Sequence, residues 1–110
     1  MGDAVGSPLA EAMNHLWAKY LPLMEARVAT LRQAAEQLAK GELTAPEQRE
    51  AAADAHKLAG VLGTFGLKEA TDLAREAESL YDKSQEEVRP LAARLAAIAE
   101  QLRAMIAGRK

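Results

Sequence analysis

Residues 44–66 read TAPEQREAAADAHKLAGVLGTFG, and this stretch indicates the helical character of the chain. Thr44 and Glu47 have the spacing of a capping box, in which a hydroxyl and a carboxylate each bind a free backbone group at a helix start. Gly66 can adopt the left-handed conformation that often ends a helix. Between them, apolar residues recur at the three- to four-residue period of an α-helix; these are Ala51, Ala55, Leu58, Leu62 and Phe65. The stretch therefore predicts one amphipathic helix that ends at Phe65-Gly66.

Three further segments show the same helical period, and they are residues 24–38, 67–81 and 84–105. Gly41 provides an end for the first of them. The last begins with Ser84 and Glu87, a second capping box. Pro90 lies about one turn inside this last segment, so the helix either begins later or bends there.

The segment before Pro22 begins with Ser7 as a predicted N-cap and Pro8 at the first helical position. Pro22 removes a backbone hydrogen bond and clashes with the preceding turn, which predicts a break or a kink. We expect a short separate helix that covers one end of the molecule, because Trp17 and Tyr20 supply apolar area for it to bury. The alternative is that these residues form the first turns of a kinked helix.

Composition and connection lengths together define the expected fold. Of the 110 residues 49% are hydrophobic, but only one Trp, one Phe and two Tyr are present, so the core must consist largely of Leu and Ala. No run alternates apolar and polar residues, so we expect no strand. Short connections between amphipathic helices favour an all-α, antiparallel up-down four-helix bundle with a short or kinked N-terminal helix. Its expected divisions are a flexible N-terminus (1–6), a single bundle (7–107) and a C-terminal tail (108–110).

Several classes of function are disfavoured by what the sequence lacks. A net charge of -2, with basic residues scattered among acidic ones, argues against nucleic acid as a partner. No apolar run approaches the roughly 20 residues that span a bilayer, so we expect no membrane partner and a cytoplasmic protein. The chain has no cysteine, and its two histidines, His15 and His56, lack the spacing of metal ligands. The few hydroxyl side chains do not suggest a hydrolytic triad.

His56 is the candidate functional residue, because it lies off the apolar stripe of its helix and points toward solvent. Its neighbours on the helix surface are all small; they are Ala52, Ala53, Ala59, Gly60 and Gly63. A glycine inside a helix costs about 1 kcal/mol relative to alanine. We therefore interpret these small residues as clearance and a docking surface for a partner that reaches the imidazole. For Gly63 the alternative is close helix packing.

Nucleophilic catalysis by the histidine itself is the chemistry that remains. An exposed imidazole is largely neutral at pH 7 and presents a free ring nitrogen, which can accept a phosphoryl group and pass it on. Such a site needs space, an oriented ring and one or two cations. Lys57, Lys68 and Arg75 are candidates for contacting the phosphate or a partner.

The pattern around His56 resembles the signature of histidine-containing phosphotransfer (HPt) domains; its parts are His56-Lys57-Leu58-Ala59-Gly60, Gly66, Leu73 and Glu78. The resemblance implies a phosphoryl carrier rather than an enzyme, with His56 as phosphoacceptor and Gly60 as the clearance residue. It implies no cofactor on this chain, since the partner receiver domain would bring Mg²⁺. In the related kinase domains a glutamate orients the histidine ring, and Glu78 matches its position. Many members carry a lysine three residues after the histidine, where this chain has Ala59.

The partners that the resemblance implies are a response-regulator receiver domain and, as a further candidate, a sensor or hybrid histidine kinase. The segment from Gly63 to Gly66 also resembles the phosphotransfer domain of chemotaxis-type histidine kinases. Two alternatives therefore stand beside a phosphorelay intermediate. One is the phosphoacceptor domain of such a kinase, and the other is a helical interaction module that is never phosphorylated.

Overall fold

The computed structural model describes residues 7–109, and it contains helices and no strand within them. The all-helical bundle is thus confirmed. Residues 1–6, predicted to be a flexible N-terminus, lie outside the described part. The elements in chain order are α1 (Pro8–Ala39), α2 (Ala45–Thr64), α3 (Lys68–Tyr81), α4 (Gln85–Val88), the 3₁₀ turn η1 (Arg89–Leu91) and α5 (Ala92–Gly108).

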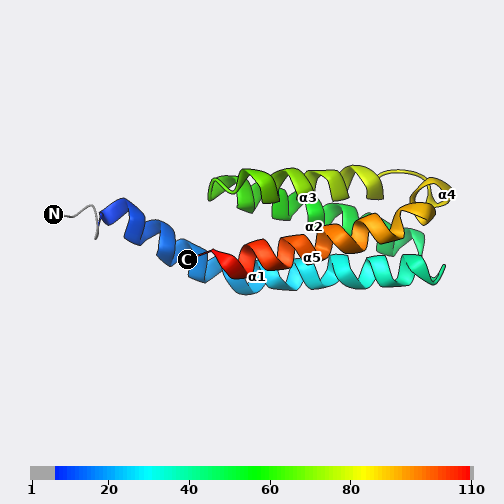
Figure 1. Cartoon of the computed structure of the whole chain (residues 1–110), viewed down its shortest axis with the longest axis horizontal. Helices are drawn as coiled ribbons and strands as arrows, with labels where there is room; N and C mark the ends of the chain where they lie inside the picture. The colour runs from blue at the N-terminus through cyan, green and yellow to red at the C-terminus, as the bar shows by residue number, and fades with distance from the viewer. Residues whose placement is uncertain (1–6, 110) are drawn as a thin grey trace.

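The helices lie side by side along the longest axis of a molecule that measures 57 × 20 × 17 Å (Figure 1). The chain runs along this axis in α1, runs back in α2, runs forward again in α3 and returns in α5 (Figure 1). Helix α2 packs most extensively against α3, and α1 against α5. The contacts of α1 with α2 and of α3 with α5 close the ring around a common core.

Local signals at the helix ends act as the sequence predicts. The Thr44 hydroxyl accepts the Glu47 backbone N–H at 3.2 Å, while Glu47 accepts the Thr44 backbone N–H at 3.0 Å. Ser84 and Glu87 form the same reciprocal pair ahead of α4. Gly66 follows α2 with φ +71°, in the left-handed region that favours glycine. These devices fix where α2 begins and ends, and so fix the position of His56 along it.

The expectation of a separate N-terminal helix is wrong, because α1 is one helix of 32 residues that continues through Pro22. Trp17 and Met24, on either side of the proline, are both buried against the bundle. Trp17 meets the edge of the Phe65 ring at 5.0 Å between centroids. Tertiary packing therefore holds the helix together where its own hydrogen bonding is interrupted. Its first turns extend beyond the end of the bundle (Figure 1).

Near Pro90 the predicted last helix is interrupted, and its long part begins only after the proline. Helix α4 ends at Val88, the 3₁₀ turn carries the proline, and α5 follows from Ala92. At its other end α5 continues to Gly108, one residue beyond the predicted end of the bundle at 107. Arg109, assigned to the tail, places its guanidinium 4.5 Å over the Trp17 ring.

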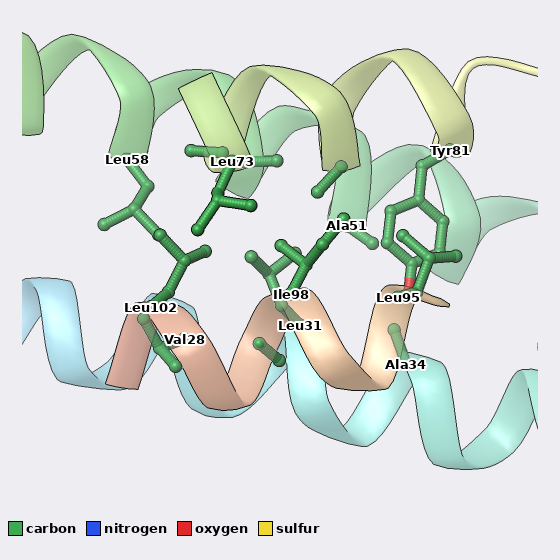
Figure 2. Close-up of a cluster of buried hydrophobic side chains, with 14 of the residues drawn as sticks. Val28, Leu31, Ala34, Ala51, Leu58, Leu73, Tyr81, Leu95, Ile98 and Leu102 are labelled. Atoms are coloured by element: carbon green, nitrogen blue, oxygen red, sulfur yellow. The ribbon is translucent and has the colours of Figure 1, made fainter. Parts of the chain in front are cut away.

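The core is built from leucine, isoleucine and alanine, as the composition predicts. Leu31, Leu58, Leu62, Ile98 and Leu102 are fully buried, and Figure 2 shows several of them meeting between the helices. Alanines predominate where α2 meets α3, and this allows the two backbones to approach closely; they include Ala51, Ala55, Ala59, Ala70, Ala74 and Ala77.

Candidate functional site

His56 stands on the outer side of α2 with 73% of its side chain exposed. Its Nδ1 lies 2.9 Å from Oε2 of Glu78, which comes from the neighbouring helix α3 and is 30% exposed. The ring is thus open to solvent but tied at one nitrogen to a second helix. The structure brings together these two residues, which are far apart in the chain.

The contact has a defined chemical consequence for the imidazole. An ionised carboxylate only accepts hydrogen bonds, so the neutral ring donates its proton from Nδ1 to Glu78. This places the free electron pair on Nε2, the nitrogen that Glu78 does not contact. The pair therefore selects the tautomer and the orientation that a nucleophilic Nε2 requires.

A regular register between α2 and α3 explains why Glu78 meets His56. About two turns further along α2 from His56, a β-carbon on Gly63 would lie 3.9 Å from the Thr71 hydroxyl of α3. Thr71 and Glu78 therefore face α2 from the same side of α3. Ala74 lies between them on that side and is fully buried, as is expected where two helices touch.

The register also corrects two predicted docking residues. Ala52 and Ala59 are 8% and 4% exposed, so neither belongs to the open surface around His56. Both lie on the flank of α2 that α3 covers, and Ala59 lies between His56 and Gly63, at the level of Ala74. Their small size serves the contact between the helices.

Ala53 and Gly60 are exposed, in agreement with the predicted surface. A β-carbon added to Gly60 would meet nothing within 4 Å, so no internal contact requires a glycine there. Gly63 is exposed as well, but its β-carbon would make ordinary contact with Thr71. Gly60 is therefore a position in the interior of α2 at which no contact within residues 7–109 explains the absence of a side chain.

A shallow groove of about 320 Å³ runs beside Gly60, between α1 and α2. It is lined by two cations, Arg27 and Lys57, and by no carboxylate; the other lining residues are Gly60, Tyr20, Val61, Thr64 and Phe65. Within residues 7–109 neither cation pairs with an acidic side chain. Arg27 was not among the predicted site residues, because only the packing of α1 on α2 brings it here.

The other predicted cations are placed differently. Lys68 pairs with Asp72 at 3.0 Å and lies about 15 Å along α3 from Glu78, so the structure does not bring it to His56. Arg75 is exposed and lies one turn before Glu78, on the same side of α3. His15 is exposed on α1, away from this site.

The described chain holds no cluster of three side chains suited to a metal ion. None of its helices combines the length and the apolar character needed to cross a bilayer.

Comparison with known proteins identifies the family to which this chain belongs. The Hpt domain family model matches residues 15–108, nearly the whole chain, and the protein therefore belongs to the Hpt domain family. Domains of this family are phosphotransfer carriers that work with receiver domains and kinases in phosphorelays.

Among curated proteins, the chain is similar to Protein RcaC of Microchaete diplosiphon, with 36% identity over 66 residues. The match covers 60% of this chain and spans about a tenth of the relative's length. No solved structure matches the chain.

Proposed function

We propose that this domain is a phosphorelay intermediate that carries a phosphoryl group on Nε2 of His56. The observation that carries the proposal is the exposed ring, fixed through Nδ1 to Glu78 at 2.9 Å. The donor and the acceptor in this scheme are aspartates of receiver domains.

In the transfer step Nε2 of His56 attacks the phosphorus of an aspartyl phosphate in line with the bond that breaks. The N–P bond forms as the P–O bond to the aspartate breaks, and the electron pair of that bond returns to the carboxylate. The ring keeps its Nδ1 proton and becomes cationic, and Glu78 offsets that charge. The reverse step uses the same atoms, so the domain can both accept and donate.

The surroundings of His56 suit such a partner. Ala53 and Gly60 leave the approach uncrowded, and reacting atoms must come within about 3–3.5 Å of each other. A receiver would bring its own Mg²⁺ and acidic pocket, and the cationic groove with Arg27 and Lys57 complements that charge. Lys57 thus has a defined place in the proposal, and Arg75 stays a candidate on the α3 side.

The test is to incubate the protein with a phosphorylated receiver domain and follow the label. We expect an acid-labile, alkali-stable label that His56→Gln abolishes without loss of helical circular dichroism. His15→Gln, which changes the other exposed histidine, is the matched control and should keep the label. A label that persists in His56→Gln would refute the assignment. Tight receiver binding without any label would favour an interaction module.

A second function is favoured by the His56–Glu78 pair, which matches the arrangement expected for the phosphoacceptor domain of a chemotaxis-type kinase. In that case an ATP-dependent kinase domain would label His56 directly. Comparing initial labelling rates from such a kinase and from a phosphorylated receiver distinguishes the two roles.

A further inference from the structure

Arg75 is an exposed cation of α3 that forms no ion pair within residues 7–109, although two carboxylates lie near it on the same helix. Asp72 and Glu78 stand three residues before and after it, a spacing at which side chains on a helix can pair. Asp72 instead contacts Lys68 at 3.0 Å. Glu78 contacts Nδ1 of His56 at 2.9 Å. The guanidinium of Arg75 is therefore free to bind a different anion.

The register between α2 and α3 places Arg75 close to the level of His56. Two contacts define this register, and they join His56 to Glu78 and Gly63 to Thr71. The two contacts are seven residues apart on either helix, so the helices run in step. Arg75 precedes Glu78 by three residues, and it is therefore displaced from the level of His56 by about 4.5 Å along the helix axes.

Arg75 also points to the open side of this pair of helices. Viewed along α3, Glu78 lies between the buried Ala74 and Arg75, about 40° from the first and about 60° from the second. Glu78 reaches the outer edge of the contact between the helices, where it meets the exposed ring of His56. Arg75 therefore projects just outside that edge, and its long stem can carry the guanidinium toward the exposed side of the ring.

We propose that Arg75 binds the phosphoryl group that Nε2 of His56 carries, both in the phosphorylated domain and during transfer. The inference rests on the proposed function, because it takes His56 as the phosphoacceptor. A phosphoryl group brings a charge of about −1.5 to −2 at pH 7, and here it would lie next to the carboxylate of Glu78. A guanidinium offsets this charge with two parallel hydrogen bonds to phosphoryl oxygens. The same oxygens carry the charge of the transition state, so the contact also accelerates transfer.

The position of the ring favours Arg75 over the other cations near the site. Lys57 projects about 100° around α2 from His56, into the groove between α1 and α2 that Arg27 also lines. The hydrogen bond to Glu78 holds the ring on the other flank of α2, beside α3. The two groove cations therefore face a docked partner, whereas Arg75 faces the phosphoryl group itself.

The test uses phosphoramidate, a small donor that phosphorylates histidine without a protein partner. Nε2 of His56 attacks its phosphorus, the N–P bond of the donor breaks and ammonia leaves with the electron pair. The labelling rate therefore reports on the phosphoryl group and not on the docking of a receiver. We expect Arg75→Gln to slow labelling about 10-fold, because a charge-assisted contact is lost. Arg75→Lys keeps the charge but loses the paired hydrogen bonds, and its rate should be intermediate.

A matched control and a second measurement separate a direct contact from general electrostatics. Arg49→Gln removes the same charge from the exposed face of α2, about 10 Å of helix from His56, and should label at the wild-type rate. In ³¹P NMR titrations of the labelled protein, the phosphoryl pKa should be higher in Arg75→Gln than in the wild type, because the loss of a cation disfavours the dianion.

Wild-type labelling by phosphoramidate and an unchanged phosphoryl pKa in a folded Arg75→Gln would overturn the proposal. If transfer from a receiver is slowed in that variant all the same, Arg75 contacts the receiver instead. An equal loss of rate in Arg49→Gln would also overturn the direct contact. Arg75-dependent labelling of His56 by phosphoramidate, without labelling by any receiver, would support this inference and refute the relay role. A His56 that neither donor labels would refute both.

Discussion

Replacing Gly60 is predicted to raise stability and to lower phosphotransfer. Glycine in a helix interior costs about 1 kcal/mol relative to alanine, mainly through backbone entropy. A β-carbon at this exposed position meets nothing within 4 Å, so no clash opposes that gain. Gly60→Ala should therefore stabilise the fold by about 0.5–1 kcal/mol. For a domain of this size the change raises the melting temperature by about 4–8 °C per kcal/mol.

The same substitution places atoms where the partner is proposed to approach. A displacement of about 1 Å from a productive geometry can cost on the order of 10²-fold in rate. We expect a modest loss of transfer rate in Gly60→Ala and up to about 100-fold in Gly60→Gln. Quenched-flow transfer from a radiolabelled receiver measures the rate, and thermal unfolding of the same samples measures stability.

Two controls isolate the cause of each effect. Ala97→Gln adds the same side chain to an exposed position of α5 and should leave transfer unchanged. Gly66→Ala changes a glycine that is also uncrowded but has φ +71°, so it should cost about 1–2 kcal/mol where Gly60→Ala gains stability. Wild-type transfer by a well-folded Gly60→Gln would refute the clearance role. A Gly60→Ala that is no more stable than wild type would refute the conformational reasoning.

Three further predictions concern other contacts. Glu78→Gln removes the charge that holds Nδ1 of His56 and should slow transfer about 10–100-fold, with changed imidazole ¹⁵N shifts and unchanged receiver affinity. Tyr81→Phe removes a buried hydroxyl that has no partner within residues 7–109, and should raise the free energy of unfolding by about 1 kcal/mol in urea titrations. Hydrogen bonds from Arg94 lower the pKa of Glu76 from its ordinary 4.5, so their stabilisation is complete above that pH and is lost as the pH falls through the lowered value. Arg94→Gln should flatten this acid limb of the stability curve, and an unchanged limb would contradict it.

The helix ends could be predicted because their signals are local. Thr44 and Glu47 need only each other to cap α2, and Gly66 needs only its own backbone freedom. Pro22 misled the prediction for the opposite reason. Its local effect is to interrupt the helix, but the burial of Trp17 and Met24 on both sides depends on the assembled bundle.

The residues of the candidate site also fall into two groups: those that local spacing in the sequence predicts, and those that only the assembled bundle brings into place. His56 and Gly60 could be found from spacing on one helix, since both lie outside its buried face. The width of the buried face of α2 could not be predicted from the sequence, because it depends on how closely α3 approaches. Ala52 and Ala59, which were predicted to be docking residues, are therefore buried. Arg27 reaches the groove from α1, and no pattern near His56 in the sequence points to it.

The close contact of α2 with α3 links two features of the site. One is Ala59, which stands where many members of the family carry a lysine, and the other is the contact of the His56 ring with Glu78. Ala59 is 4% exposed and lies at the level of the fully buried Ala74, so the helices approach closely enough for Glu78 to reach the ring. A lysine at position 59 would have to displace α3 or bury its stem along it, which would move that carboxylate away. Two cations that pair with no acidic side chain within residues 7–109 accordingly lie on the other side of α2, where Arg27 and Lys57 line the groove. The same alanine that leaves this position of α2 without a cation thus lets Glu78 reach the ring that is proposed to carry the phosphoryl group.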